Sequence, residues 1–182
     1  IAPGSEEGEK VALALVEAFY KQIFEHGFFH GDPHPGNLFV EPSGALAFID
    51  FGLCGHLSVS QRDDLVTLIL AVLSGDIDSL ARILLRMGQP MGHVSLSAFK
   101  AEVAHIRERH FKQRLDEIDI TRFLDECFDA AQRHRIRISA EYSILSKSAM
   151  TVEGVIRRIA PSLNLQDHIQ PYSRRLLQDH YA

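Results

Sequence analysis

The sequence predicts a mostly helical α+β lobe in which one small β-hairpin carries a polar loop. Apolar residues recur at helical spacing over most of the 182 residues, as in amphipathic helices. Two β-prone runs, 38–40 and 45–49, lie close together, as in a hairpin. The stretch 30–39, HGDPHPGNLF, is too rich in turn formers for a helix and too polar for a buried strand. We therefore expect one hairpin on a bundle of about six or seven helices.

The chain opens with a stretch of linker composition. Residues 1–8 are rich in glycine, proline and acidic side chains, which predicts a linker before a folded lobe over 9–182. A first helix is expected over 9–26, because apolar residues recur there every three or four positions. Gly27 follows where a helix C-cap belongs.

The hairpin comes next. Glu-Pro-Ser-Gly separates its two runs, which predicts a four-residue turn. Paired strands lie about 5 Å apart, so the two ends of a hairpin meet. Asn37 precedes the first strand and Asp50 follows the second, so we expect these two side chains to lie side by side.

From Ser58 onward the sequence predicts a helical subdomain over 58–180. Its helices carry recognisable ends: Asp76 suits an N-cap, Gly88 ends a helix and Pro161 stops the last one. The expected helices span 58–73, 76–87, 97–114, 121–135 and 140–159. One stripe of the last helix is apolar and should face the core. It consists of Leu145, Ala149, Val152, Ile156 and Ile159.

Composition narrows the class of protein. A net charge of −5 argues against a nucleic-acid partner, which favours a basic surface. Cys54 and Cys127 have no CxxC spacing, which predicts a reducing compartment without a disulfide or a zinc site. The apolar runs are far shorter than the ~20 residues of a membrane span, and no signal peptide opens the chain. We expect a cytoplasmic protein, and since the first residue is Ile1, a fragment.

Two stretches carry candidate chemistry. Asp32 is followed five residues later by Asn37, and Asp-Phe-Gly occupies 50–52 after the hairpin. Kinases use this order, with the first Asp at the nucleophile and the Asn and second Asp at magnesium. Mg²⁺ prefers oxygen ligands, so one carboxylate, one amide and substrate phosphates suffice. The pattern predicts Mg²⁺-dependent chemistry on ATP, with Asp32 orienting an acceptor hydroxyl or a water molecule.

Two other interpretations of the loop exist. His30, Asp32 and His34 stand at alternate positions and could form a metal-hydrolase cluster. Against this, the flanking prolines stiffen the loop, and no second histidine–carboxylate cluster follows. A polar turn without chemistry is the other interpretation. The ordered combination of loop, hairpin and Asp-Phe-Gly favours the phosphotransferase.

The same residues resemble a known family. The segments 30–40 and 49–58 resemble the UbiB/ADCK family of atypical kinases, whose members carry HxDPHPGN followed by DFG. The similarity continues through 61–88 and through 151–164, where Ala160 replaces the acid usual in the family. The resemblance covers nearly the whole chain and implies the C-terminal lobe of a protein-kinase-like fold, with the catalytic loop at 30–37.

The resemblance implies roles for individual residues. Asp32 would be the catalytic-loop aspartate. His30, the other catalytic-loop residue, would be mainly structural, packing under Phe51 and tying the loop to the Asp-Phe-Gly backbone. ATP and Mg²⁺ would be held by Asn37, Asp50, Phe51 and Gly52, with Asn37 and Asp50 as the metal ligands.

Three further residues are noted without a catalytic role. His34 receives no chemical role from its spacing. Glu153 matches a family motif, and the modest explanation is a buried helix glutamate that holds a loop amide or an arginine. Gly154 follows it inside a helix, where close packing against another helix would explain a glycine.

The resemblance also implies a biological role. It suggests an ATPase or kinase that supports ubiquinone (prenyl-quinone) biosynthesis, with prenyl-quinone or lipid intermediates and quinone-biosynthesis proteins as partners, peripheral at the inner membrane. Aminoglycoside and choline kinases also use an HGD loop followed by an Asp-containing triplet, and Gly31 is closer to their loop. A non-catalytic scaffold is a further alternative.

Two absences shape the expected activity. Only five residues, 53–57, separate Gly52 from the first helix cap at Ser58, so there is no room for the peptide-docking segment of protein kinases. A small molecule, a lipid or water is the expected acceptor. No glycine-rich loop, strand lysine or KxGQ occurs upstream. The N-terminal lobe is therefore expected to be missing, and the isolated chain to bind nucleotide weakly and have impaired activity.

Overall fold

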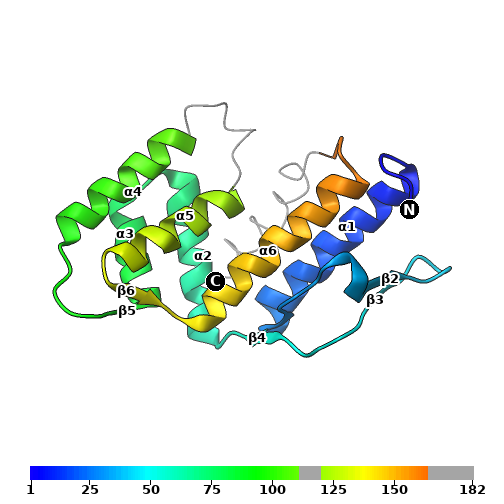
Figure 1. Cartoon of the computed structure of the whole chain (residues 1–182), viewed down its shortest axis with the longest axis horizontal. Coiled ribbons are helices and arrows are strands. Elements are labelled where there is room, and N and C mark those ends of the chain that lie inside the picture. The colour runs from blue at the N-terminus through cyan, green and yellow to red at the C-terminus, as the bar shows by residue number, and fades with distance from the viewer. Residues whose placement is uncertain (111–119, 164–182) are drawn as a thin grey trace, which may run out of the picture. The chain divides into compact units, whose positions relative to one another are not determined.

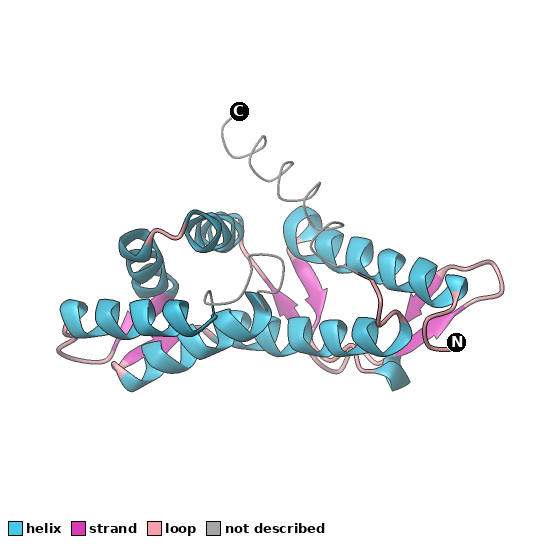
Figure 2. Ribbon diagram, turned by 90° about the horizontal axis from the view of Figure 1, so that it is seen from above, coloured by secondary structure: helices cyan, strands magenta, loops and turns pink. Residues whose placement is uncertain are grey.

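A computed structural model describes residues 1–110 and 120–163 of the chain (Figure 1). The described residues divide into two compact units: unit 1 contains residues 1–58 and 147–163, and unit 2 contains residues 59–110 and 120–146. Helix α6 (Ala140–Ile159) has the predicted bounds and runs from unit 2 into unit 1. The predicted class, mostly helical with small antiparallel sheets, is confirmed (Figure 2).

Unit 1 starts with helix α1 (Glu6–Tyr20), three residues earlier than predicted. Ser5 is the N-cap, and its hydroxyl accepts a hydrogen bond from the Gly8 amide at 3.0 Å. The acidic residues that suggested a linker lie in the first helical turn, where they stabilise the helix dipole. Residues 6–8 therefore belong to the helix, and the predicted linker was too long.

The end of the first helical segment is irregular. The π-helical turn η1 (Lys21–His26) continues α1 without a break. Gly27 then caps it with a φ of 65°, in the left-handed region that glycine adopts freely. The C-cap predicted at this glycine is confirmed, and the chain leaves it directly into a strand.

Unit 1 contains two antiparallel strand pairs. The predicted hairpin is present as β2 (Leu38–Val40) and β3 (Leu46–Phe48), with Leu38 opposite Phe48. The second pair, β1 (Phe28–His30) with β4 (Cys54–His56), was not predicted. Strands of three residues are too short to show a period of two, and these are separated by the whole loop and hairpin.

The core of unit 1 joins α1, α6 and the hairpin. Ala12 and Leu15 of α1 pack with Val152 and Ile156 of α6, and the two helices run side by side in Figure 1. The apolar stripe predicted for α6 thus contributes to this core. Three hairpin side chains, Leu38, Leu46 and Phe48, pack against the same cluster. The hairpin is therefore fixed by apolar contacts, and it places the segments at both of its ends.

Unit 2 is built from helices and one further strand pair. The elements are α2 (Val59–Ser74), α3 (Ile77–Met87), β5 (Gly88–Pro90), α4 (Leu96–His110), α5 (Ile120–Arg133) and β6 (Ile136–Ile138). Asp76 caps α3 as predicted and accepts a hydrogen bond from the Ser79 amide at 3.0 Å. The end predicted for the α4 helix, residues 111–114, lies outside the described residues.

Strand pair β5–β6 explains two differences from the predicted helix ends. Arg135 has a φ of 61°, which ends α5 before the predicted boundary and turns the chain into β6. Gly88 does end α3, but it also opens β5 opposite Ile138. A Cβ at Gly88 would lie 2.6 Å from Ile136 Cγ2, so only glycine fits there. Within the described residues, no helix is long and apolar enough to cross a membrane.

Candidate functional site

The polar loop of unit 1 connects β1 to β2. His30 ends β1, and the short 3-10 turn η2 (Pro35–Asn37) leads into β2. The Asn37 amide donates to the His34 carbonyl at 2.8 Å and closes this turn. Proline at its first position presets the backbone angle. The residues singled out in the loop are thus held by a short and stiff connection between two strands.

His30 joins the loop to the segment before Asp-Phe-Gly. Its ring is 2% exposed, and Nδ1 accepts a hydrogen bond from the Asp32 amide at 3.1 Å. The proton must therefore sit on Nε2, which lies 2.9 Å from the Ile49 carbonyl and donates to it. The ring also packs against Phe51, with centroids 5.3 Å apart. The expected contact with Phe51 is present, whereas the expected bond to the Asp-Phe-Gly backbone is made one residue earlier, to Ile49.

Asn37 lies beside the segment that carries Asp50. Its side chain is buried, and Nδ2 donates to the Asp32 carbonyl at 3.0 Å, which leaves Oδ1 as the free acceptor of the amide. The Asn37 carbonyl accepts a hydrogen bond from the Ile49 amide at 3.0 Å. The backbone at Asn37 is thus bonded to the residue immediately before Asp50, as a hairpin requires.

Asp50 has an unusual backbone. Its φ is 59°, in the left-handed region that few residues other than glycine adopt and in which aspartate is over-represented. Asp50 is exposed, and its Oδ1 accepts a hydrogen bond from the Gly52 amide at 3.3 Å. Phe51 is also exposed. The positive φ turns the chain away from β3 and sends it toward β4.

His34 faces Asp32 across the loop. Its Nδ1 accepts a hydrogen bond from the Gly36 amide at 3.0 Å, and its Nε2 lies 3.9 Å from Asp32 Oδ2. A Cβ at Gly36 would lie 2.7 Å from His34 Cε1, so glycine makes room for the ring. His34, which received no role from the sequence, caps the 3-10 turn.

The metal-hydrolase interpretation does not fit these contacts. Both ring nitrogens of His30 are engaged within the protein, so neither is available to a metal ion. In the part of the chain that the structure describes, no group of three or more His, Cys, Asp or Glu side chains is placed to hold a metal. The magnesium site predicted from the sequence has only two protein ligands, one of them an amide, so it does not require such a group.

Two side chains outside the predicted motifs hold the backbone of His30. The His30 amide donates to Gln22 Oε1 at 2.9 Å, and the His30 carbonyl accepts from Ser148 Oγ at 2.7 Å. Gln22 lies in η1 and Ser148 in α6. Sequence reasoning missed both, because a single polar residue in a helix gives no sign of a partner far along the chain.

The two family-motif residues on α6 have simpler explanations. Glu153 Oε1 accepts hydrogen bonds from Nε and Nη2 of Arg157, one turn later, at 2.8 and 2.6 Å. The expectation that Glu153 holds an arginine is confirmed, but the side chain is half-buried and not buried as expected. Gly154 is exposed, and a Cβ there would meet nothing within 4 Å. Close helix packing is therefore not the reason for this glycine.

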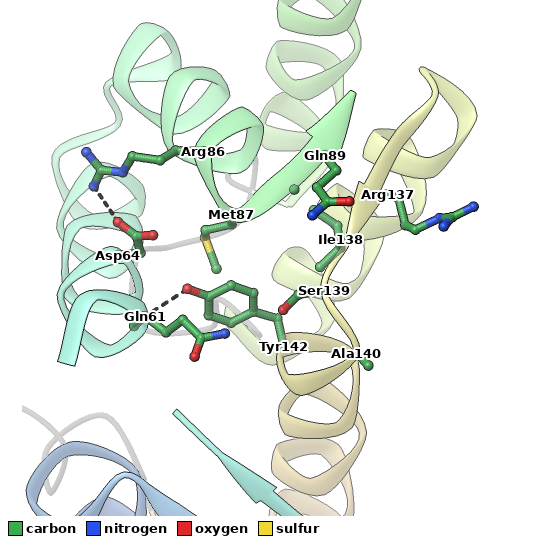
Figure 3. Close-up of a pocket in the computed structure, with 11 residues that line it drawn as sticks. Gln61, Asp64, Arg86, Met87, Gln89, Arg137, Ile138, Ser139, Ala140 and Tyr142 are labelled. Carbon is green, nitrogen blue, oxygen red and sulfur yellow. Dashed lines mark hydrogen bonds and ion pairs between the residues drawn. The ribbon is translucent and has the colours of Figure 1, made fainter. Parts of the chain in front are cut away.

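Unit 2 contains a pocket of about 290 Å³ (Figure 3). Tyr142 donates a hydrogen bond to the Gln61 carbonyl at 3.1 Å there, and Arg86 pairs with Asp64 at 2.7 Å. Burial, with the Asp64 charge nearby, raises the pKa of Tyr142, so its phenol stays protonated. None of the predicted site residues lines this pocket. The candidate chemistry therefore lies in the loop and hairpin of unit 1.

The geometry of the loop defines a class of protein. An aspartate, an asparagine five residues later, and an Asp-Phe-Gly segment tied back by a buried histidine are typical of kinase-like proteins. The ABC1 atypical kinase-like domain matches residues 3–84, and the UbiB helical domain matches residues 103–164. The chain belongs to the UbiB family of ABC1 atypical kinase-like proteins.

The chain is also similar to individual proteins. A protein of Clostridium pasteurianum described as "Uncharacterized protein in hydrogenase 1 5'region" is 34% identical over 90% of this chain and 31% of its own length. A "Probable protein kinase UbiB" of Cellvibrio japonicus is 31% identical over 95% of this chain and 32% of its own length. That of Pseudomonas putida is 29% identical over 92% of this chain, again 32% of its own length.

The chain thus spans about a third of the length of these curated relatives. No solved structure matches it. The match to the UbiB helical domain favours the UbiB family over the aminoglycoside and choline kinases, whose resemblance rested on the HGD loop and the Asp-containing triplet after it.

Proposed function

We propose that unit 1 provides the magnesium-binding and catalytic part of a UbiB-type ATPase or kinase. The observation that carries the proposal is the bonding around His30. Through the Asp32 amide and the Ile49 carbonyl, one buried ring links the loop aspartate to the segment that holds Asp50. A link of this kind is what a reaction that depends on positioning requires.

The oxygen atoms of the site suit Mg²⁺. Asn37 would offer Oδ1, since its Nδ2 is engaged by the Asp32 carbonyl. Asp50 would offer the carboxylate oxygen that does not accept from Gly52. Both are hard oxygen ligands, and Mg²⁺ commonly uses few protein ligands together with substrate phosphates. Bound there, Mg²⁺ would neutralise phosphate charge on ATP.

The other residues would position the reactants. Asp32 is exposed and would orient the acceptor hydroxyl or water and accept its proton. His34 Nε2 faces the Asp32 carboxylate at 3.9 Å, where a hydrogen bond would form after a small movement of either side chain. Phe51 covers one side of the His30 ring. His30 would serve by holding the loop. It would take no part in proton transfer, because both of its ring nitrogens are hydrogen-bonded within the protein.

The segment after Asp-Phe-Gly supports a small acceptor. Strand β4 starts two residues after Gly52, is paired with β1 along its length, and is followed at once by α2. A chain that is tied down in this way does not provide the docking segment that protein kinases offer to a peptide. We propose a small molecule, a lipid intermediate or water as the acceptor.

The biological role follows from the family. Relatives carry the name "Probable protein kinase UbiB", and we propose that the whole protein supports ubiquinone (prenyl-quinone) biosynthesis. Prenyl-quinone intermediates and quinone-biosynthesis proteins would be its partners, and the protein would act at the surface of the inner membrane.

Asp50→Asn in the whole protein tests the proposal. It removes one negative charge from the magnesium site and keeps the shape of the side chain. We expect Mg²⁺-dependent ATP hydrolysis to fall by about 100-fold or more, since several kcal/mol of charge stabilisation are lost. The melting temperature should change little, because Asp50 is exposed.

Asp76→Asn is the matched control. It makes the same chemical change at a helix N-cap, where asparagine caps as well as aspartate does. Its hydrolysis rate should equal that of the unsubstituted protein. An Asp50→Asn protein that hydrolyses ATP at the same rate would remove Asp50 from the magnesium site, and the proposed mechanism with it.

A further inference from the structure

Strand β1 has an outer edge that faces away from its partner strand. In an antiparallel pair, only alternate residues exchange hydrogen bonds with the opposite strand. The Leu57 amide donates to the Gly27 carbonyl at 2.7 Å, and the Gly31 amide donates to the Leu53 carbonyl at 2.9 Å. The backbone amides and carbonyls of the odd-numbered residues 27, 29 and 31 therefore point toward β4. His30 lies between them, and its amide and carbonyl point to the other side.

Two side chains satisfy this outer edge. Gln22 Oε1 accepts from the His30 amide at 2.9 Å, and Ser148 Oγ donates to the His30 carbonyl at 2.7 Å. Ser148 is fully buried, so no water replaces its hydroxyl. Gln22 projects from the π-helical turn η1, an irregularity that is frequent at functional sites.

The ring of the same residue carries the link described above. His30 therefore has all four of its hydrogen-bonding groups engaged: the amide with Gln22, the carbonyl with Ser148, and the two ring nitrogens with the Asp32 amide and the Ile49 carbonyl. Because the backbone of His30 sets where its ring can lie, the two helix side chains also set the position of Asp32 relative to Asp50.

We propose that Ser148 and Gln22 are positioning residues for the catalytic loop, acting on Asp32 and Asp50 through His30. The inference rests on the proposed function, since it assigns what these two side chains do for the same site. Neither residue belongs to the loop or to Asp-Phe-Gly. They act on the rate of the reaction, with little effect on nucleotide affinity.

Ser146 provides a comparison on the same helix. It lies two residues before Ser148, is also buried, and its Oγ donates to Asp125 Oδ1 at 3.2 Å. Removing either hydroxyl takes one hydrogen bond from a buried serine. Only the hydroxyl of Ser148 contacts the loop, so Ser146→Ala separates positioning from a general loss of stability.

The experiment measures Mg²⁺-dependent ATP hydrolysis by variants of the whole protein. Ser148→Ala and Gln22→Met remove the two contacts, whereas Ser148→Thr keeps the hydroxyl and Gln22→Glu keeps an acceptor oxygen. We expect kcat to fall by about 10- to 100-fold in the first pair, with KM for Mg-ATP within about threefold. The conservative pair and Ser146→Ala should stay within about threefold of the unsubstituted kcat.

Gln22 is partly exposed, so its variants serve if a change at the fully buried Ser148 prevents folding. A kcat for Ser148→Ala and Gln22→Met equal to that of Ser146→Ala would overturn the positioning role and leave the proposed function standing.

Hydrogen–deuterium exchange of the segment 28–33 gives a readout that does not need activity. The His30 and Asp32 amides lie in this segment and are the ones bonded through Gln22 and the His30 ring. We expect about 10-fold faster exchange there in Ser148→Ala and Gln22→Met than in Ser146→Ala. If the unsubstituted protein hydrolyses no ATP, the proposed function fails. The exchange result then decides alone whether these side chains hold the loop, and unchanged exchange rejects it.

Discussion

The two units of this chain differ in how their buried polar groups are arranged. In unit 1, His30, Asn37 and Ser148 are buried and hydrogen-bonded around one loop. In unit 2 the fully buried large side chains are nearly all apolar, among them Leu68, Leu80, Leu84, Phe99 and Phe123. Unit 1 thus gathers three buried polar side chains around the loop, as expected where positions must be held for chemistry.

Charged groups of unit 2 stay near the surface and join its helices. Glu102 on α4 accepts hydrogen bonds from Arg133 and His134 at 2.6 Å each. The hydrogen bond from Arg133 and, after it, that from His134 hold the pKa of Glu102 below its usual range. Exposed pairs of this kind contribute only about 0–1 kcal/mol. The stability of unit 2 therefore comes mainly from its apolar core.

Around the candidate site of unit 1, apolar burial contributes little. Phe39, Ile49, Phe51 and Leu53 are 44–58% exposed. Asp50 lies among these residues, so beyond the apolar contacts that fix the hairpin, hydrogen bonds and the backbone turn hold it. The comparison predicts that core substitutions in unit 2 reduce stability, whereas polar substitutions in unit 1 reduce activity.

Phe123→Ala in unit 2 should have the largest effect on stability. The side chain is fully buried and packs edge-on against His110, with ring centroids 5.6 Å apart. Loss of a buried phenylalanine costs about 3–5 kcal/mol of unfolding free energy. Chemical denaturation followed by circular dichroism measures this change. Hydrolysis per folded molecule should be unaltered, since the loop of unit 1 keeps its contacts.

Leu73→Ala is the control for this prediction. Leu73 is 54% exposed on α2 of the same unit, so its truncation should change the unfolding free energy by about 0.5 kcal/mol or less. Equal losses for Phe123→Ala and Leu73→Ala would contradict the claim that an apolar core holds unit 2.

The sequence predicted what depends on local signals. Helix α6 has periodicity over twenty residues, Asp76 is a strong N-cap, and the hairpin has a clear turn. The order of Asp32, Asn37 and Asp-Phe-Gly pointed to the loop through side-chain chemistry. Each of these features is encoded within a few consecutive residues, so no tertiary contact was needed to find it.

What sequence reasoning missed depends on contacts between distant segments. Strand β1 pairs with β4 across the entire loop and hairpin, and Ser148 meets His30 from 118 residues away. The linker composition of residues 6–8 also concealed a first helical turn capped by Ser5. The packing explanation for Gly154 failed because periodicity gives the face of a helix but not whether a neighbour covers it.

Cys127 offers a second test of the apolar core of unit 2. It is fully buried on α5, and burial raises the pKa of its thiol to about 12. The folded state keeps this proton at a pH where the unfolded chain, with a thiol pKa of about 8.5, loses it. The contribution of Cys127 to the unfolding free energy is therefore fully present below about pH 8.5. It is lost as the pH rises from there toward 12, by about 1.4 kcal/mol per pH unit at most.

Unfolding free energies at pH 8 and pH 10, for the unsubstituted protein and for Cys127→Ala, measure this term. The decrease between the two pH values should be smaller in the variant by about 1–2 kcal/mol. Parallel decreases would mean that Cys127 titrates at an ordinary pH. The core around α5 would then tolerate a charged thiolate as readily as the exposed loop of unit 1 tolerates its carboxylates.

Gly154→Ala is expected to have the smallest effect and the opposite sign. Gly154 lies inside α6 in unit 1, where a Cβ would meet nothing within 4 Å. Alanine is favoured over glycine in a helix interior by about 1 kcal/mol, so the variant should be more stable by that amount. Thermal and urea unfolding of the protein measure the gain, and Ala149→Gly on the same helix should give a loss of at least that size, since Ala149 is half-buried on the apolar stripe. A loss of stability in Gly154→Ala would mean that another segment or molecule lies against this exposed position and needs the space that glycine leaves. Unit 1 would then be organised by packing at a place where the described residues leave Gly154 open.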